Sequence, residues 1–273
     1  MTTQRFARMF AALKDKNEGA FVPFVNLCDP NENESLEILE TLVAAGADAL
    51  ELGIPFSDPM ADGPVIMVSA KRAIDAGSTT GRCMAVIERF RARHPDVPVS
   101  LMVYANLVYA PGVENFFAMC ARAGVDVVLI PDLPESMREV DRSFDDAAQA
   151  HGMGLVSIAP PKASEALLHQ IARSSQGYVY LLSRPGITGE NNPAHMPAEQ
   201  VIEGLAQAGA TPGLLGFGVS SPEHVRAALQ AGAAGVIVGS AIVRMINEHF
   251  EDPALLKEKL TEYVRSMKNA ARR

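Results

Sequence analysis

The sequence predicts an α/β protein of the (β/α)8 barrel class, with an extra N-terminal helix and a single domain over residues 1–273. Short apolar segments of strand length alternate with amphipathic helical segments about eight times. A joint that begins with Ala-Gly recurs at 45–48, 123–126 and 231–234, and each copy leads into an apolar strand. Glycine suits the left-handed residue after a helix. Continuous apolar strands joined by helices are typical of a parallel sheet covered by helices.

An open doubly wound sheet would show the same alternation. Eight units in a chain close to the usual barrel length of about 250 residues favour the closed barrel. No Gly-x-Gly-x-x-Gly turn follows the first expected strand, which argues against a dinucleotide-binding sheet. Neither a composition shift nor a linker marks a domain boundary.

The elements follow in order from apolar spacing and from glycine and proline breaks. Phe6, Met9, Phe10 and Leu13 recur at helical spacing and predict the N-terminal helix. Strands are expected near 20–27, 47–53, 97–104, 125–131, 154–159, 177–182, 213–218 and 234–239. Further helices are expected near 35–45, 67–76, 82–93, 113–123, 136–150, 165–174, 198–208, 222–231, 241–248 and 255–267.

The overall composition and charge limit the classes of partner, ligand and location that we expect. The formal net charge is −8 and the pI about 5.3, so a nucleic-acid partner is not expected and an anionic substrate must be held by local dipoles. Three cysteines without metal-ligand spacing indicate a reducing compartment. Neither a secretory signal nor a membrane span is visible, so we expect a cytoplasmic protein. The six histidines are scattered, so neither a metal nor a cofactor is expected.

The stretch 49–64, ALELGIPFSDPMADGP, carries the strongest chemical signal. Glu51 interrupts an apolar strand, where a carboxylate is costly unless it is paired or used. Asp58 and Asp62 follow on a loop that prolines and a glycine hold in shape. This pattern predicts a proton-transfer site. The alternative is an edge strand with a solvent-facing Glu51 and two aspartates that form turns.

Two glycine–serine loops at the ends of the last two strands predict a phosphate site. They read GFGVSSPEHV at 216–225 and GSAIV at 239–243, and each opens a helix. Free helix N-terminal N–H groups bind anions, and these two loops are the usual phosphate position in this barrel. The alternative is plain serine capping of helices. The long segment 183–197 is either a lid or an ordinary surface loop.

Six blocks, in order, resemble the tryptophan synthase alpha chain family. They are GAFVPFV at 19–25, ELGIPFSDPMADGP at 51–64, YANLV at 104–108, YLLSRPGITG at 180–189, GFGVSSPE at 216–223 and GSAIV at 239–243. The resemblance implies a TIM barrel that is a carbon–carbon lyase of tryptophan biosynthesis. It would cleave indole-3-glycerol phosphate to indole and glyceraldehyde 3-phosphate by a retro-aldol reaction, without a cofactor. The indole would pass to a beta chain in an α2β2 complex.

The resemblance also implies residue roles. Glu51 would be the acid and base at indole C3, and Asp62 would accept the indole N–H. Pro55 and Asp58 would lie on the loop that faces the beta chain. The other substrate-binding residues implied are Phe24, Tyr104, Leu129, Tyr180, Thr188, Gly189, Phe217, Gly218, Ile237, Gly239 and Ser240.

The chain departs from the family pattern at Asn26, Cys28, Met67 and Pro185, which bears on lid closure and on coupling to the partner. Two other functions stay open at this stage. One is another phosphate-binding barrel isomerase or lyase, and the other is a regulatory subunit without catalysis.

Overall fold

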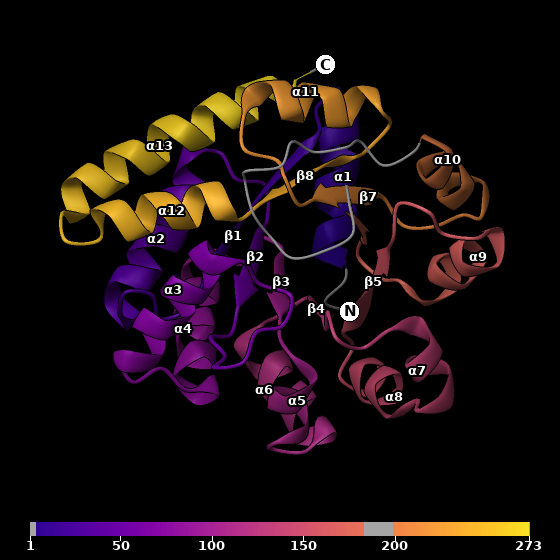
Figure 1. The fold of residues 1–273 in the computed structure, drawn as a ribbon, viewed down its shortest axis with the longest axis horizontal. Coiled ribbons are helices and arrows are strands. Elements are labelled where there is room, and N and C mark those ends of the chain that lie inside the picture. Colours follow the sequence, from indigo (N-terminus) through magenta and orange to yellow (C-terminus); the bar gives the residue numbers. More distant parts are fainter. Residues whose placement is uncertain (1–3, 183–198, 273) are drawn as a thin grey trace.

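Eight parallel strands form a closed barrel in sequence order in the computed structural model, which describes residues 4–182 and 199–272 (Figure 1). β8 pairs with β1 and closes the ring. The strands are β1 (Ala20–Asn26), β2 (Leu50–Gly53), β3 (Val99–Met102), β4 (Val127–Leu129), β5 (Gly154–Ala159), β6 (Val179–Leu182), β7 (Gly213–Gly216) and β8 (Gly235–Val238). The predicted (β/α)8 barrel is confirmed.

Helices surround the strands and connect them (Figure 1). They are α1 (Gln4–Asp15), α2 (Glu32–Ala45), α3 (Pro64–Asp75), α4 (Thr80–Arg93), α5 (Ala105–Tyr109), α6 (Val113–Ala123), α7 (Glu135–Val140), α8 (Ser143–Ala150), α9 (Glu165–Ser174), α10 (Glu199–Gln207), α11 (Pro222–Gln230), α12 (Ser240–His249) and α13 (Pro253–Ala270). The extra N-terminal helix is confirmed as α1. Within the described residues, no helix has the length and apolar character needed to cross a membrane.

Two local expectations were wrong. The single helix expected at 136–150 is two helices, because Asp141 adopts an extended backbone and its side chain accepts the N–H of Ser143. The short helix α5 after β3 was not expected, since its five residues are too few to show a helical apolar period.

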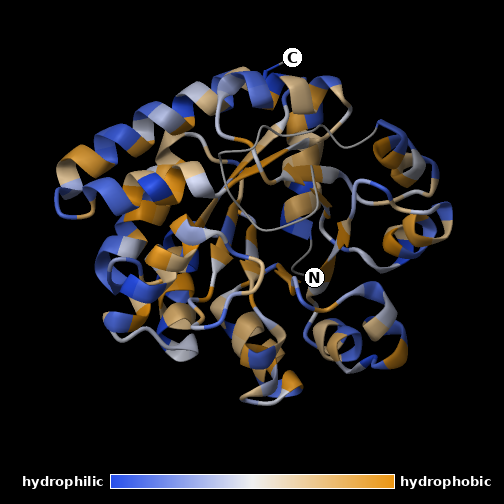
Figure 2. Cartoon of the chain, viewed as in Figure 1, coloured by the Kyte–Doolittle hydropathy of each residue, from blue (hydrophilic) through white to orange (hydrophobic). Residues whose placement is uncertain are grey.

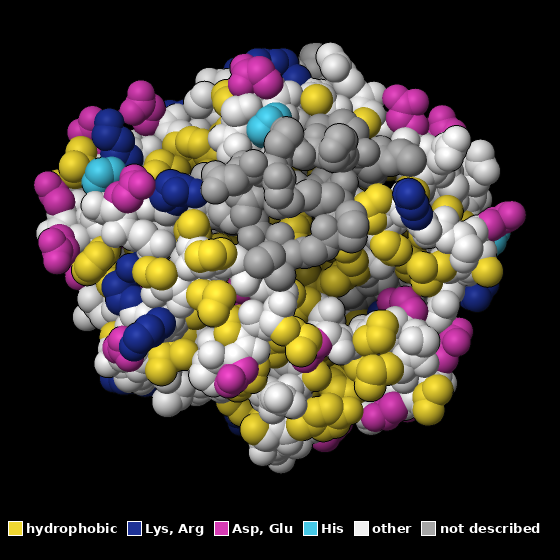
Figure 3. All heavy atoms as spheres, in the orientation of Figure 1, with side chains coloured by type: hydrophobic (Ala, Val, Ile, Leu, Met, Phe, Trp, Pro, Cys, Tyr) yellow, Lys and Arg dark blue, Asp and Glu magenta, His cyan; other side chains and the backbone are white. Residues whose placement is uncertain are grey.

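Side chains along each strand alternate between the barrel interior and the helix layer, as strand geometry requires. On β1, Val22 and Phe24 belong to the interior cluster, whereas Phe21 and Val25 pack among the helices. Figure 2 shows the central strands as mostly hydrophobic and the surrounding helices as mixed. Figure 3 shows charged side chains mainly around the rim of one face, with apolar ones nearer its middle. The barrel interior is therefore a packed hydrophobic core, and a reaction can take place in it only at a cavity.

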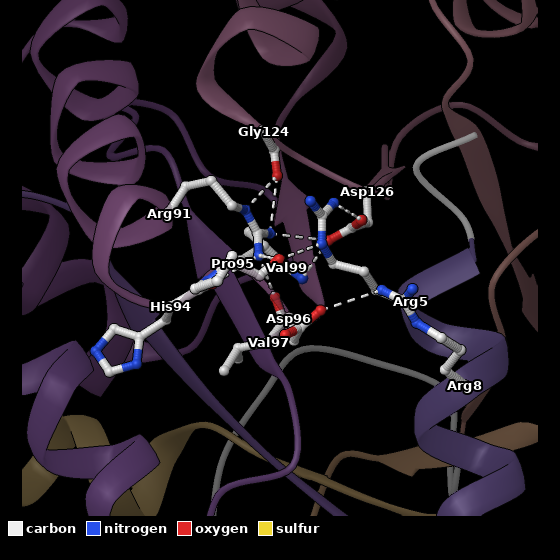
Figure 4. Close-up of polar contacts among 10 residues, drawn as sticks. All are labelled: Arg5, Arg8, Arg91, His94, Pro95, Asp96, Val97, Val99, Gly124 and Asp126. Carbon is white, nitrogen blue, oxygen red and sulfur yellow. Dashed lines mark hydrogen bonds and ion pairs between the residues drawn. The ribbon is translucent and has the colours of Figure 1, made fainter.

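α1 closes the amino-terminal end of the barrel. Its Phe6 is fully buried against Tyr178, with ring centroids 5.4 Å apart. Arg5 donates to Asp126, the residue just before β4, at 2.8 Å. Asp126 also accepts from Arg91 at 3.0 Å and from the N–H of Val99 at 2.8 Å (Figure 4). One buried carboxylate thus joins α1, α4 and the starts of β3 and β4.

We predict that Asp126→Asn lowers the free energy of unfolding by about 3 kcal/mol, because it leaves two partly buried arginines without their counter-charge. Urea unfolding followed by circular dichroism measures the change. The control is Asp96→Asn in the same cluster, where the exposed carboxylate makes a 3.4 Å contact with the exposed Arg8. Equal stability of the two variants would contradict the prediction.

Candidate active site

Glu51 points into the barrel interior. It lies in the middle of β2, in register with Phe24 of β1 and Ser100 of β3. Its neighbours Leu50 and Leu52 belong to the helix-facing core, so alternation turns the Glu51 side chain to the other side. The residue is only 1% exposed. The solvent-facing alternative for Glu51 is wrong.

A hydroxyl pair holds the Glu51 carboxylate. The Tyr178 hydroxyl donates to Glu51 Oε1 at 2.7 Å and lies 2.9 Å from the Ser100 hydroxyl. Sequence reasoning missed both residues. A signal was present, because Tyr178 and Tyr180 stand two apart on one strand and therefore share the interior face.

Burial changes the chemistry of Glu51. Loss of hydration disfavours its charged form and raises its pKa to about 7, against the hydrogen bond from Tyr178, which lowers it. The nearby charge of Asp62 raises it further. A carboxyl group with this pKa can both give and take a proton near neutrality.

Asp62 faces the same interior from the loop between β2 and α3. Its N–H donates to Pro59 O, and the neighbouring Ala61 N–H donates to the Tyr104 hydroxyl at 3.1 Å. Burial raises the pKa of Asp62 to about 6, opposed by the hydrogen bond with Tyr104. Burial therefore brings the pKa values of both carboxyl groups close to neutral pH.

One cavity contains most of the predicted site residues. Glu51 and Asp62 line it together with Phe24, Leu129, Tyr180, Phe217, Gly218, Ile237, Gly239 and Ser240. Tyr104 does not line the cavity and lies behind Asp62, to which it is hydrogen-bonded. Sequence reasoning missed seven apolar lining residues, which are Ala61, Ile66, Met102, Pro131, Ile158, Leu182 and Val219. The walls are thus mostly apolar and contain two carboxyl groups.

The loops after β7 and β8 also line the cavity and offer backbone N–H groups. Phe217 and Gly218 both have left-handed backbones, with φ of 68° and 73°, so the chain turns sharply after β7. Gly239 precedes the first residue of α12, Ser240, and both line the cavity. A helix N-terminus of this kind carries free N–H donors and a favourable dipole for an anion.

The loop 54–63 carries Asp62 and also has residues that do not line the cavity. Pro55 is buried, whereas Asp58 is exposed and Met60 is 72% exposed. Thr188, Gly189 and Pro185 lie outside the described residues.

The departures from the family pattern fall at the end of β1 and on α3. Asn26 donates to Ile66 O at 3.2 Å and to the Ser69 hydroxyl at 3.0 Å. Cys28 has a left-handed backbone with φ of 61°. Met67 is 45% exposed. Asn26 thus fastens β1 to α3, the helix that follows Asp62.

Within the described residues, no group of three or more His, Cys, Asp or Glu side chains is placed to hold a metal ion. The two carboxyl groups that line the cavity can give or take a proton.

Comparisons with known proteins agree with this geometry. The family model described as tryptophan synthase alpha chain matches residues 10–272. The tryptophan synthase alpha chain of Vibrio parahaemolyticus is 50% identical over 269 residues, which are 98% of this chain and 99% of that one. The one from Klebsiella pneumoniae is 49% identical with the same coverage.

Solved structures show the same fold. The alpha subunit of Legionella pneumophila tryptophan synthase matches with a TM-score of 0.83 at 28% identity, over 98% of each chain. A chain of the Pyrococcus furiosus tryptophan synthase a2b2 complex matches with a TM-score of 0.79 at 33% identity, over 92% of this chain and 98% of that one. The chain described here belongs to the tryptophan synthase alpha chain family.

Proposed function

We propose that this alpha chain cleaves indole-3-glycerol phosphate into indole and glyceraldehyde 3-phosphate, with Glu51 as acid and base and Asp62 as the electrostatic partner of the indole nitrogen. The observation that carries the proposal is the pairing of two buried carboxyl groups with raised pKa values in one mostly apolar cavity. An apolar cavity suits the indole ring, and the backbone donors at Gly218, Gly239 and Ser240 suit the phosphate.

Glu51 begins the reaction in its protonated form. It gives its proton to C3 of the indole ring, and the ring nitrogen becomes positively charged. The bond between C3 and the glycerol chain then breaks as the neighbouring hydroxyl loses its proton to Glu51. The electron pair of that bond returns to the ring, so indole leaves as a neutral product and Glu51 is protonated again. A pKa of about 7 fits a group that must act in both directions.

Asp62 stabilises the charge that develops during this step. In its ionised form it accepts the indole N–H and faces the positive nitrogen. Tyr104 and the loop backbone hold it in place. Tyr178 acts through Glu51, because its hydroxyl fixes the direction of the carboxylate.

The proposal includes a beta-chain partner in an α2β2 complex, as in the P. furiosus relative. The loop with exposed Asp58 and Met60 is the proposed contact, since an exposed methionine next to the catalytic loop offers apolar area to a partner. The three buried free cysteines agree with a cytoplasmic location.

The decisive experiment mixes the purified chain with indole-3-glycerol phosphate and follows the release of indole and of triose phosphate. Both products in equal amounts support the lyase. An isomerised sugar phosphate without indole would indicate another barrel enzyme. Binding without turnover, both alone and with a beta chain, would indicate a regulatory subunit.

We predict that Glu51→Gln lowers turnover about 100- to 10,000-fold, because the side chain keeps its size and loses its titrating proton. Steady-state kinetics of indole release measures the effect. The matched control is Glu37→Gln on the exposed face of α2, which should turn over like the parent. More than about a tenth of parental turnover in Glu51→Gln would exclude the role.

As the pH rises, Glu51→Gln should become more stable relative to the parent protein. The folded pKa of about 7 lies above the ordinary value of 4.5, so the proton on Glu51 contributes stability that is complete below pH 4.5 and lost as the pH rises through about 7. Glutamine has no such loss. Relative to the parent, its free energy of unfolding should therefore rise by about 3 kcal/mol between about pH 4.5 and about pH 8. Urea titrations of both proteins at each pH test this, and parallel pH curves would contradict the pKa shift.

We predict that Gly218→Ala weakens the binding of glycerol 3-phosphate about tenfold, because a side chain at this left-handed turn disturbs the donors that face the anion. Isothermal calorimetry measures the affinity. The control is Gly209→Ala, which has the same left-handed backbone at φ of 75° and open space around the new methyl group. Equal affinities in the two variants would place the phosphate elsewhere.

A further inference from the structure

We propose that Cys28 and Cys83 form an oxidisable dithiol, which a peroxide converts into a disulfide bond within the chain. The site lies outside the catalytic cavity, in the layer between β1 and α4. Neither thiol takes part in the lyase chemistry.

The two sulfur atoms already face each other. Cys28 Sγ and Cys83 Sγ are 3.8 Å apart, and both side chains are buried. A disulfide has an S–S length of about 2.05 Å, so the sulfurs must approach by roughly 2 Å. Cys28 stands on the turn after β1, which is an irregular segment, and Cys83 stands in the first turn of α4. Rotation of the two side chains and a small shift of the turn can supply this approach.

The contact between the two sulfurs affects the acidity of both thiols. The hydrogen bond with Cys83 lowers the pKa of the Cys28 thiol, against the effect of burial. The same contact, together with burial, raises the pKa of the Cys83 thiol. Either sulfur can be the S–H donor in this contact. Cys28 lines a surface cavity and Cys83 does not, so Cys28 is the sulfur that a peroxide meets first. Thiolates are the form that reacts with peroxides.

Cys28 lines a surface cavity. The other lining residues are Asn31, Glu32, Asn33, Ala76, Ser78 and Arg82. The Arg82 guanidinium crosses this cavity to Glu32 at 2.5 Å and also donates to Gly77 O. The negative charge of Glu32 raises the pKa of the Cys28 thiol, and the smaller effect of the Arg82 charge lowers it. The third cysteine, Cys120, is buried in α6, and burial raises the pKa of its thiol.

The chemistry balances with hydrogen peroxide as the oxidant. The Cys28 thiolate attacks one peroxide oxygen, the O–O bond breaks, and the released hydroxide takes a proton to become water. The resulting sulfenic acid is then attacked by the Cys83 sulfur, which forms the S–S bond. The sulfenic hydroxyl leaves as a second water with the Cys83 proton. Two thiols are oxidised and one peroxide is reduced.

The bond would fasten the turn after β1 to α4. This turn lies between Asn26, which holds α3, and Asp29, which accepts from Arg72 of α3 at 2.7 Å. Oxidation therefore adds a covalent bond next to Asn26 and Asp29, the side chains that hold α3. α3 is the helix that follows Asp62.

The test treats the reduced full-length chain with hydrogen peroxide, removes the oxidant, and titrates thiols after denaturation. The number of free thiols should fall from the three of the sequence to one, and a peptide map should contain a Cys28–Cys83 cross-link in a monomeric chain. In Cys120→Ser the reaction should still occur and leave no free thiol. In Cys83→Ser no cross-link should form, and dimedone should label Cys28 as a sulfenic acid.

Cys28→Gly is the matched control for folding, because glycine prefers the left-handed backbone that Cys28 occupies with φ of 61°. It should fold and keep both remaining thiols under the same treatment. The proposal is overturned if the parent keeps all three thiols, if Cys28→Gly loses thiols as fast as the parent, or if the cross-link joins Cys120 or two separate chains.

Discussion

The inward and outward alternation of eight parallel strands in a closed ring decides where every other group can lie. Once β8 pairs with β1, each strand residue faces either the interior or the helix layer. The Glu51 side chain then faces the interior. Its neighbours there are Ser100, its register partner on β3, and Tyr178. The site is therefore a consequence of barrel closure.

The low polarity of the barrel interior changes the pKa values of Glu51 and Asp62. The apolar walls remove water from Glu51 and Asp62, which raises both pKa values and brings them close to neutrality. The cost of burying charge is limited because Glu51 can hold its proton. At the amino-terminal end of the barrel, a buried carboxylate is instead paired with positive charges. Asp126 is matched by two arginines and a backbone N–H, which suits a structural carboxylate that need not react.

A second polar cluster connects the end of β1 with the two helices that border the cavity. Asp29 pairs with Arg72 of α3, and Arg72 also donates to Asn247 of α12 at 2.8 Å. The Asn247 amide in turn donates to Val65 O at 3.1 Å. α3 follows the loop of Asp62, and α12 begins at Ser240, which lines the cavity. This cluster therefore fixes the positions of these two helices relative to each other.

The sequence by itself determined the fold class, the order of the elements, and the identity of Glu51 and Asp62 as the residues to examine. These follow from local patterns, namely continuous apolar strands, glycines after helices, and a carboxylate in an apolar run. The glycine–serine loops after the last two strands were also visible as a pattern, and the resemblance to a family added the apolar residues around the cavity. Only the tertiary structure decided which polar groups meet. Tyr178 and Glu51 are 127 residues apart, Arg72 and Asn247 are 175 apart, and Cys28 and Cys83 are 55 apart. No local spacing encodes these pairs, because they are neighbours only after the ring of strands has closed and the helices have packed on it.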